Sequence, residues 1–264
     1  MSSVDLLDLA ALIMAGAGLL YASISDVRTR EVSNTLWLIL LPAGGVTTGI
    51  RFLVYPELTL LIVVSLAIIV LISLGGFYSG IFGGADAKAF MCLATLTPLI
   101  PTSVPPFLGP FHPFFAITML VNSFLVSSLS AVGMLIRNLP QLLFKRGGLF
   151  RGFEQESVLT KLSALFSGFR IPLADLESKS FYFPMEAIDE DPPARRIKLI
   201  QNVEEDRGLV IGKLREQVSP QDTVWATPAL PHLLFLGIGF LLTLFIGDLI
   251  LWVMLAAMYS LIRI

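Results

Sequence analysis

Six long apolar runs, separated by short polar turns and one long polar segment, dominate the chain. They cover residues 6–25, 35–54, 58–78, 84–101, 113–136 and 231–262. Each approaches or exceeds the roughly 20 residues that an α-helix needs to cross the hydrocarbon core of a bilayer. The fourth run is the weakest because it is short and carries Lys88, and the sixth is long enough to tilt or to extend past the bilayer. The pattern predicts a polytopic membrane protein with six transmembrane helices.

Charged residues are few and unevenly distributed along the chain. Hydrophobic residues make up 55% of the sequence and charged residues 14%, against roughly a quarter charged in soluble domains. Of the 38 charged residues, 18 basic and 20 acidic, 25 lie between Leu139 and Thr227. This segregation predicts a membrane domain of five helices over residues 1–138, a soluble domain over residues 139–227, and the sixth transmembrane helix within residues 228–264.

The basic residues beside the apolar runs indicate an orientation in the cell membrane. Those on one side follow the first and fifth runs, and are Arg28, Arg30, Arg137, Lys145, Arg146 and Arg151. The opposite side carries only Arg51 and Arg263. Because basic residues near span ends favour the cytoplasm, both termini are predicted to lie outside and the soluble segment inside. The turns at the end of the first run and the start of the fourth then share the cytoplasmic face.

The polar segment has patterns typical of a small folded domain. Apolar residues recur at helical spacing from Val158 to Phe169. This helix could lie on the membrane surface, with Lys161 and Arg170 toward the headgroups, or be an ordinary core helix. Short β-prone runs follow at Phe181–Phe183, Ile197–Ile200, Leu209–Ile211 and Thr223–Trp225, divided by Asp189–Pro193 and Glu204–Gly208. We expect an all-α polytopic membrane protein with a small, partly β cytoplasmic domain between helices five and six.

Two aspartates stand at the predicted cytoplasmic ends of apolar spans. Asp26 ends the first span and Asp86 opens the fourth. Acidic residues at a bilayer are costly and often functional. Two neighbouring carboxylates that share a site cannot both stay ionised. One can then draw a proton from water while the other polarises a carbonyl, which is the chemistry of aspartyl proteolysis.

The residues around Asp86 suit such a site. Gly83 and Gly84 relax the backbone just before a helix begins, so a substrate strand or the partner aspartate could approach the main chain closely. The positive end of that helix favours a negative charge on Asp86. Lys88 is two positions further on and faces another side of the helix. It is interpreted as an interfacial anchor or a modulator of the local charge.

At these residues the chain resembles a known family. Gly83-Gly84-Ala85-Asp86 is similar to the Gly-x-Gly-Asp signature of membrane aspartyl proteases, with Ala85 in place of the second glycine. Asp26-Val-Arg-Thr-Arg-Glu-Val-Ser-Asn34 resembles the first-aspartate motif of type IV prepilin peptidases. Val224-Trp-Ala-Thr-Pro-Ala-Leu-Pro231 resembles a Trp-x-Thr-Pro segment of their archaeal branch, the preflagellin and prepilin peptidases.

The resemblance implies an enzyme that removes the short basic leader from preflagellin or pilin-like precursors. The cut would fall before the hydrophobic helix of the precursor, at the cytoplasmic edge of the bilayer. Bacterial members often carry a paired-cysteine zinc site, which the single Cys92 cannot supply. No metal, no cofactor and no nucleic-acid partner are expected. His112 and His232 are isolated in the sequence and are interpreted as structural.

Some residues leave alternatives open. Pro228-Ala229-Leu230 resembles the Pro-Ala-Leu motif of presenilins and signal peptide peptidases, which cut within transmembrane helices, but such a segment is equally a helix start. Asp248 lies deep in the sixth span, either as a tether with an unidentified partner or as a member of the pair. A small proton-coupled transporter and a membrane scaffold are further alternatives; a transporter would favour deep acids and repeated halves.

The sequence thus gives a set of candidate site residues and one unresolved requirement. We expect Asp26 and Asp86 to be catalytic, and Gly83, Gly84, Ala85, Lys88, Pro228, Ala229 and Leu230 to shape the site or bind substrate. Catalysis requires the two aspartates, 60 positions apart, to approach within about one bridging water. A site that closes only on substrate is one way to meet that requirement.

Overall fold

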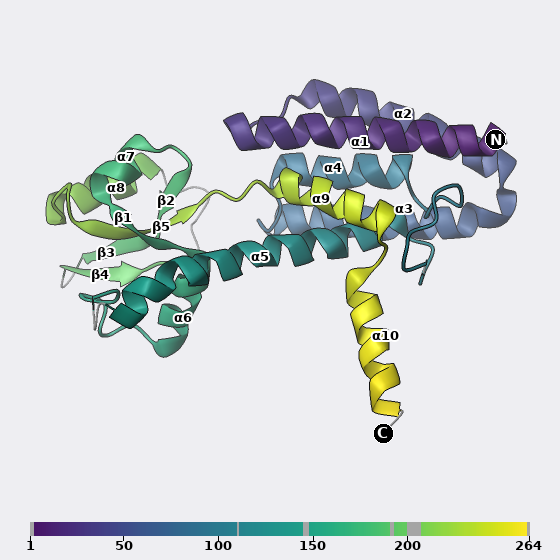
Figure 1. The fold of residues 1–264 in the computed structure, drawn as a ribbon. Coiled ribbons are helices and arrows are strands. Elements are labelled where there is room, and N and C mark those ends of the chain that lie inside the picture. The colour runs from purple at the N-terminus through teal and green to yellow at the C-terminus, as the bar shows by residue number, and fades with distance from the viewer. Residues whose placement is uncertain (1–2, 110, 145–147, 191–192, 200–206, 263–264) are drawn as a thin grey trace. The chain divides into compact units, whose positions relative to one another are not determined.

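The computed structural model divides the chain into two compact units. It describes residues 3–109, 111–144, 148–190, 193–199 and 207–262. The first unit comprises Met1–Ser127 with Pro231–Ile264, and the second comprises Ser128–Leu230. Figure 1 shows the elements of both units, each of which is described here by itself.

The first unit is built from helices. Four long or medium helices come first, followed by the start of α5 and by two helices from the end of the chain. Their bounds are α1 Ser3–Thr29, α2 Asn34–Val54, α3 Thr59–Tyr78, α4 Gly84–Leu96, α5 Phe115–Phe144, α9 His232–Phe245 and α10 Leu249–Ile262, with a 3-10 turn η1 at Pro56–Leu58. Helix α5 continues past Ser127 into the second unit.

The described helices give four candidate membrane spans, or five if one bent pair counts as a single span. They are Leu6–Thr29, Asn34–Val54, Pro56–Tyr78, Phe115–Leu143 and the pair α9 and α10, which are bent by 54° at a short break. The expected count of six is not confirmed. The fourth predicted span contains α4, whose 13 residues are about 20 Å long and too short to cross the hydrocarbon core.

Helix α3 shows why such helices belong in a bilayer. Its buried residues form one narrow stripe, Ile62, Ser65, Ile69 and Ser73. Two of these four are serines, and Ser65 Oγ donates to Pro98 O at 2.7 Å. The rest of the helix is almost wholly apolar and faces outward, with Leu71 exposed. Small polar residues inside and large apolar residues outside are typical of a helix packed in lipid.

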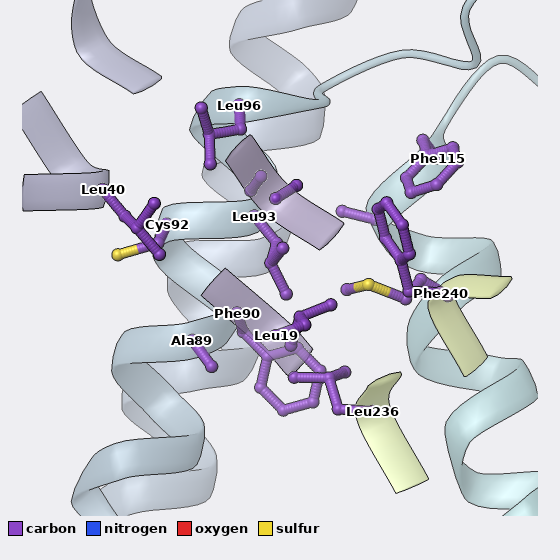
Figure 2. Close-up of a cluster of buried hydrophobic side chains, with 14 of the residues drawn as sticks. Leu19, Leu40, Ala89, Phe90, Cys92, Leu93, Leu96, Phe115, Leu236 and Phe240 are labelled. Carbon is purple, nitrogen blue, oxygen red and sulfur yellow. The ribbon is translucent and has the colours of Figure 1, made fainter. Parts of the chain in front are cut away.

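A buried apolar cluster joins the helices of the first unit. Figure 2 shows part of it, including Leu19 from α1, Phe90 and Leu93 from α4, and Phe240 from α9. Helix α1 packs against both α4 and α9. The first and fourth predicted spans therefore touch, which the sequence alone left open.

Two glycines set how closely these helices approach. A Cβ added to Gly44 of α2 would lie 2.2 Å from Thr95 Oγ1 of α4. A Cβ added to Gly239 of α9 would lie 2.2 Å from Ser123 Oγ of α5. Small residues at such crossings let helix backbones pack tightly in membranes. They hold α4 and α9 in place, and these two helices carry the candidate site.

In its described residues, the second unit has two small antiparallel sheets, the end of α5 and three further helices. Strand β5 (Thr223–Pro228) lies between β1 (Phe169–Pro172) and β2 (Tyr182–Pro184), and β3 (Glu186–Glu190) pairs with β4 (Pro193–Ile197). The helices are α6 Val158–Ser167, α7 Leu173–Ser178 and α8 Arg207–Gln217. The predicted helix after Val158 and the predicted strands near Phe181 and Thr223 agree with α6, β2 and β5.

Two predictions for this unit were wrong. Leu209–Ile211 lies in α8 and not in a strand, because Ile211 and Leu214 recur at helical spacing and are the buried residues of that helix. Asp189–Pro193 was predicted to lie between strands, but its two ends are themselves strand residues, the end of β3 and the start of β4. Glu190 pairs with Pro193 in the β3–β4 hairpin. The predicted acidic turn at Glu204–Asp206 and the end of the run at Ile200 lie outside the described residues.

A buried carboxyl group fixes the two sheets to each other. Glu186 Oε1 accepts the Trp225 N–H at 2.6 Å, and Glu186 Oε2 lies 2.5 Å from Arg195 Nη2. Glu186 is 1% exposed. Burial raises the pKa of Glu186 above its ordinary value of 4.5, and the opposing effect of Arg195 is smaller.

Candidate active site

Asp26 lies in the last turn of α1 and contacts the first turn of α9. Its Oδ2 accepts the Leu233 N–H at 3.1 Å, and the Ser23 hydroxyl donates to Leu233 O at 2.9 Å. One residue of α9 is thus held to α1 by both of its backbone groups. The first N–H groups of a helix have no partner within the helix, and a carboxylate there also meets the positive end of the helix dipole.

Arg30 gives Asp26 a second partner. Its Nη1 lies 3.9 Å from Asp26 Oδ1, one helical turn away. Arg30 has a φ of 59°, the left-handed conformation in which helices often end, although glycine is the usual residue there. The chain turns at this residue, and the Arg30 N–H donates a hydrogen bond to the backbone carbonyl oxygen of Asp26 at 3.2 Å. The Asp26 carboxylate therefore has two neighbours, the Leu233 N–H and the Arg30 side chain.

Asp86 lies in the first turn of α4. Its Oδ2 accepts the Gly83 N–H at 3.1 Å, so the carboxylate caps its own helix. A Cβ on Gly83 would lie 3.2 Å from that oxygen, whereas a Cβ on Gly84 would meet only Phe77 at 3.6 Å. Gly83 is therefore the glycine whose lack of a side chain matters to the carboxylate. Ala85 stands at the second glycine of the signature and packs its methyl group against the apolar core.

The structure brings the two aspartates to the same end of the first unit. The C-terminal end of α1 and the N-terminal ends of α4 and α9 lie together there (Figure 1). Asp26 and His232 are both close enough to Asp86 to interact with it electrostatically. The sequence predicted the two carboxylates but did not predict the contribution of α9.

A small cavity opens beside Asp86. Its volume is about 30 Å³, room for roughly two water molecules at 10–15 Å³ each. Asp86 and His232 are the ionisable groups in its lining, which is otherwise apolar except for two serines; the lining residues are Phe82, Asp86, Phe90, Ser123, Phe124, Ser127, His232, Phe235 and Leu236. Water can therefore reach the Asp86 carboxylate from this side.

His232 was interpreted as structural from the sequence, and the structure places it in this cavity with Asp86. It is the first residue of α9, directly before the Leu233 N–H that binds Asp26. A signal was available in the sequence. His232 lies at the start of the sixth apolar run, and the end of that run nearest the soluble segment is predicted to share a membrane face with both aspartates.

Lys88 joins the two motif segments rather than facing Asp86. Its Nζ donates to Asn34 Oδ1 at 2.7 Å. Asn34 is the last residue of the first-aspartate motif and the first residue of α2. The contact connects α4 to α2 beside the site. The predicted roles of Lys88 as an anchor or a modulator of charge stay predictions.

The Pro-Ala-Leu segment lies in the second unit. Pro228 ends β5, and the Ala229 N–H donates to Phe181 O at 2.8 Å. Leu230 is the last residue of that unit, and α9 begins at His232. A role for Pro228, Ala229 and Leu230 in binding substrate stays a prediction.

Asp248 has a structural place at the break between α9 and α10. Its Oδ1 accepts the Leu251 N–H at 2.8 Å, so it caps α10, and its Oδ2 lies 3.4 Å from His112 Nε2. Asn122 Nδ2 donates to Gly247 O at 2.9 Å in the same break. The partner of Asp248 that the sequence did not identify is therefore His112.

The described part of the chain holds no group of three or more histidine, cysteine or acidic residues arranged to bind a metal ion. What the site offers is a pair of carboxylates at helix ends, a water-sized cavity and one histidine. Such a set can hold and move a proton between water and a carbonyl group.

Comparison with known proteins identifies the class of enzyme. The model of the Type IV leader peptidase family matches residues 13–138, and that of the Archaeal Peptidase A24 C-terminus Type II matches residues 160–249. The preflagellin peptidase of Methanococcus voltae is 25% identical over 249 residues, which cover 90% of this chain and 95% of that protein. The preflagellin peptidase of Methanocaldococcus jannaschii is 24% identical over 250 residues, covering 92% and 97%.

The two family matches lie in both units and include both candidate aspartates. The relatives align over nearly their whole length, so the likeness extends far beyond the short motifs around Asp26 and Asp86. Together with the apolar helices, these matches show that the chain belongs to the type IV leader peptidase family and is a membrane peptidase.

Proposed function

We propose that the protein is an aspartyl endopeptidase that removes the basic leader from preflagellin or pilin-like precursors, with Asp26 and Asp86 as its catalytic pair. The observation that carries the proposal is that Asp26 and Asp86 lie at the same end of the first unit, at the end of α1 and the start of α4. Their segments are linked by the Lys88–Asn34 hydrogen bond, and both interact with the start of α9. The relatives named as preflagellin peptidases support the choice of substrate.

In the proposed reaction the two aspartates share one proton. The ionised carboxylate takes a proton from water, and the oxygen of that water forms a bond to the scissile carbonyl carbon. The protonated carboxyl donates its proton to the carbonyl oxygen. When the tetrahedral intermediate breaks down, the aspartate that took the water proton gives it to the leaving nitrogen as the C–N bond breaks, and the other aspartate takes a proton from a hydroxyl of the intermediate as the carbonyl re-forms. The cavity of about 30 Å³ beside Asp86 is a source for the water.

We further propose that the hydrophobic helix of the precursor seats between α1 and α9. An apolar groove of about 370 Å³ runs there, lined by Gly16, Leu19, Leu20, Ser23, Leu234, Gly237, Ile238, Phe240 and Leu241. Ser23 lies three residues before Asp26, slightly less than one helical turn, so this end of the groove is near the carboxylate. A helix held there would present the residue before its start to the aspartates.

The topology is part of the same proposal. Both termini lie outside, the site faces the cytoplasm, and α4 completes a set of six membrane-inserted segments whose fourth member is short. Residues 1–138 and 228–264 form the membrane domain and residues 139–227 the cytoplasmic domain. The basic residues that follow the first and fifth spans support this orientation.

Leader release by purified protein tests the proposal. The full-length protein in bilayer nanodiscs is incubated with a preflagellin, and the product is identified by mass. We expect one cut before the hydrophobic helix, lost in Asp26→Asn and in Asp86→Asn and retained in Asp248→Asn. Cleavage by either of the first two variants would refute the pair. A cut within the helix would instead favour a presenilin-like activity.

A further inference from the structure

Helix α6 exposes an apolar face within the second unit. Four of its residues are exposed, and all four are large and hydrophobic: Val158 and Leu159 at 74%, Leu162 at 48% and Phe166 at 41%. On a helix these positions fall on one side. The polar residues of α6 are less exposed than this apolar side, which is the reverse of the pattern on a surface helix in water.

The opposite side of α6 is packed into its own unit. Ala164 and Leu165 are buried in a cluster with Leu149, Phe153 and Trp225. The Ser157 side chain caps the helix by accepting the Thr160 N–H at 3.0 Å. The helix is therefore well formed and fixed, and its exposed side is not the result of a loose segment. The interpretation of α6 as an ordinary core helix accounts for Ala164 and Leu165 but not for the four exposed residues.

The end of α6 is attached to α5 at two adjacent polar residues of that helix, Arg137 and Asn138. Asn138 is buried, and its Nδ2 donates to Leu165 O at 3.0 Å and to Gly168 O at 2.7 Å. The Arg137 guanidinium lies 3.5 Å from the centre of the Phe169 ring. Before these two residues, α5 exposes a column of apolar side chains that include Leu129, Val132 and Ile136.

This attachment fixes the depth at which the end of α6 lies along a candidate membrane span. Helix α5 belongs to the candidate span Phe115–Leu143, and Arg137 is the first charged residue along it. Charged residues at a span end lie at the interface with the headgroups. Asn138, one residue further, holds the C-terminal end of α6 at that same depth.

We propose that α6 is an interfacial helix, lying at the membrane–water boundary with Val158, Leu159, Leu162 and Phe166 among the lipid acyl chains. The occupant of the face is the bilayer, because the end of α6 is hydrogen-bonded to a candidate membrane span beside its first charged residue. Nearby cations suit anionic headgroups: Arg137 and Arg151 are exposed, and Lys161 is half-buried. The helix anchors the second unit to the membrane independently of catalysis.

The single cysteine of the chain permits a direct test. Cys92 is buried and is replaced by alanine in the full-length protein. One new cysteine is then introduced at Leu162 on the apolar face, or at exposed Gln155 just before the helix as the control. Each carries a bimane label, and the protein is placed in nanodiscs with or without brominated acyl chains.

We expect the label at Leu162→Cys to be quenched several-fold more by brominated lipid than by aqueous iodide, and the label at Gln155→Cys to show the reverse. Iodide quenching of both labels to the same degree would overturn the proposal. Protection of the Leu162→Cys label from both quenchers would also overturn it, because a protein surface would then cover the face. If the Cys92→Ala variant does not fold, Leu162→Cys and Gln155→Cys are introduced and labelled in the chain that keeps Cys92. The wild-type protein, treated with the same label, then gives the background signal from Cys92.

Discussion

At the scale of single residues, the site depends on carboxylates that cap helices. Asp86 caps α4 through the Gly83 N–H, and Asp26 caps α9 through the Leu233 N–H. A helix N-terminus supplies donors and a favourable dipole without adding a charged side chain. The arrangement holds two carboxylates at helix ends in defined orientations, and Arg30 and His232 are their charged or chargeable neighbours.

Gly83 and Gly84 should differ in their tolerance of a methyl group. A Cβ on Gly83 would crowd Asp86 Oδ2 at 3.2 Å, whereas a Cβ on Gly84 would make an ordinary contact at 3.6 Å. We expect Gly83→Ala to lower kcat by about tenfold, because small displacements of a catalytic group are costly. Gly84→Ala serves as the matched control and should retain activity. Equal losses in the two variants would contradict the explanation.

His232 should influence the pH dependence of cleavage. Histidine is the side chain whose ordinary charge change falls between pH 5 and 8, and His232 shares a cavity with Asp86. We expect His232→Gln to alter the pH profile of kcat in that range. His112→Gln is the control because its partner is Asp248, and it should leave the shape of the profile unchanged. A profile unaffected by His232→Gln would remove this residue from the site.

At the scale of elements, close helix packing holds the site together. Helix α4 is short, and its position depends on neighbours that approach closely at glycines such as Gly44. Gly45, the next residue, has no heavy atom within 4 Å of an added Cβ. Adjacent positions on one helix therefore differ sharply in the space around them.

Gly44→Ala should destabilise the membrane unit. The added methyl would lie 2.2 Å from Thr95 Oγ1 and 3.1 Å from the Leu96 backbone nitrogen, so α2 and α4 must separate. We expect a loss of about 1–3 kcal/mol, measured as a lower midpoint of thermal unfolding in detergent. Gly45→Ala should unfold at the wild-type temperature. An unchanged midpoint for Gly44→Ala would show that this crossing is looser than described.

The groove between α1 and α9 should determine substrate affinity. Leu20 lines it and is 64% exposed, so Leu20→Trp would fill part of the groove without disturbing the core. We expect a severalfold higher KM with kcat nearly unchanged, because the loss is in ground-state binding. Leu38→Trp on α2, at a position 73% exposed, is the control. A higher KM in the control alone would place the precursor helix elsewhere.

At the scale of the whole molecule, the apolar pattern predicted most helices and most of the candidate membrane spans, although the count of six is not confirmed. The runs predicted α1, α2, α3 and α5 because both lipid and a helical core require apolar residues there. The same criterion overestimated the length of α4, which has 13 residues. It also missed the break at Gly247 and Asp248, because that break depends on partners far along the chain such as His112 and Asn122.

The candidate site was predicted in part for a similar reason. Asp26 and Asp86 could be found because charge is rare in apolar segments and local motifs surround them. The Leu233 N–H could not be found, since a backbone group has no sequence signature and lies 207 positions from Asp26. The link between Lys88 and Asn34 is likewise a tertiary contact.

The most direct test of the central claim compares leader release by Asp26→Asn, Asp86→Asn and the double variant in nanodiscs. If the two aspartates work as one catalytic pair, each single substitution should lower kcat/KM by about 10³-fold or more, and the double variant should lose no more than either. Substantial release by either single variant, or losses that multiply in the double variant, would contradict the account.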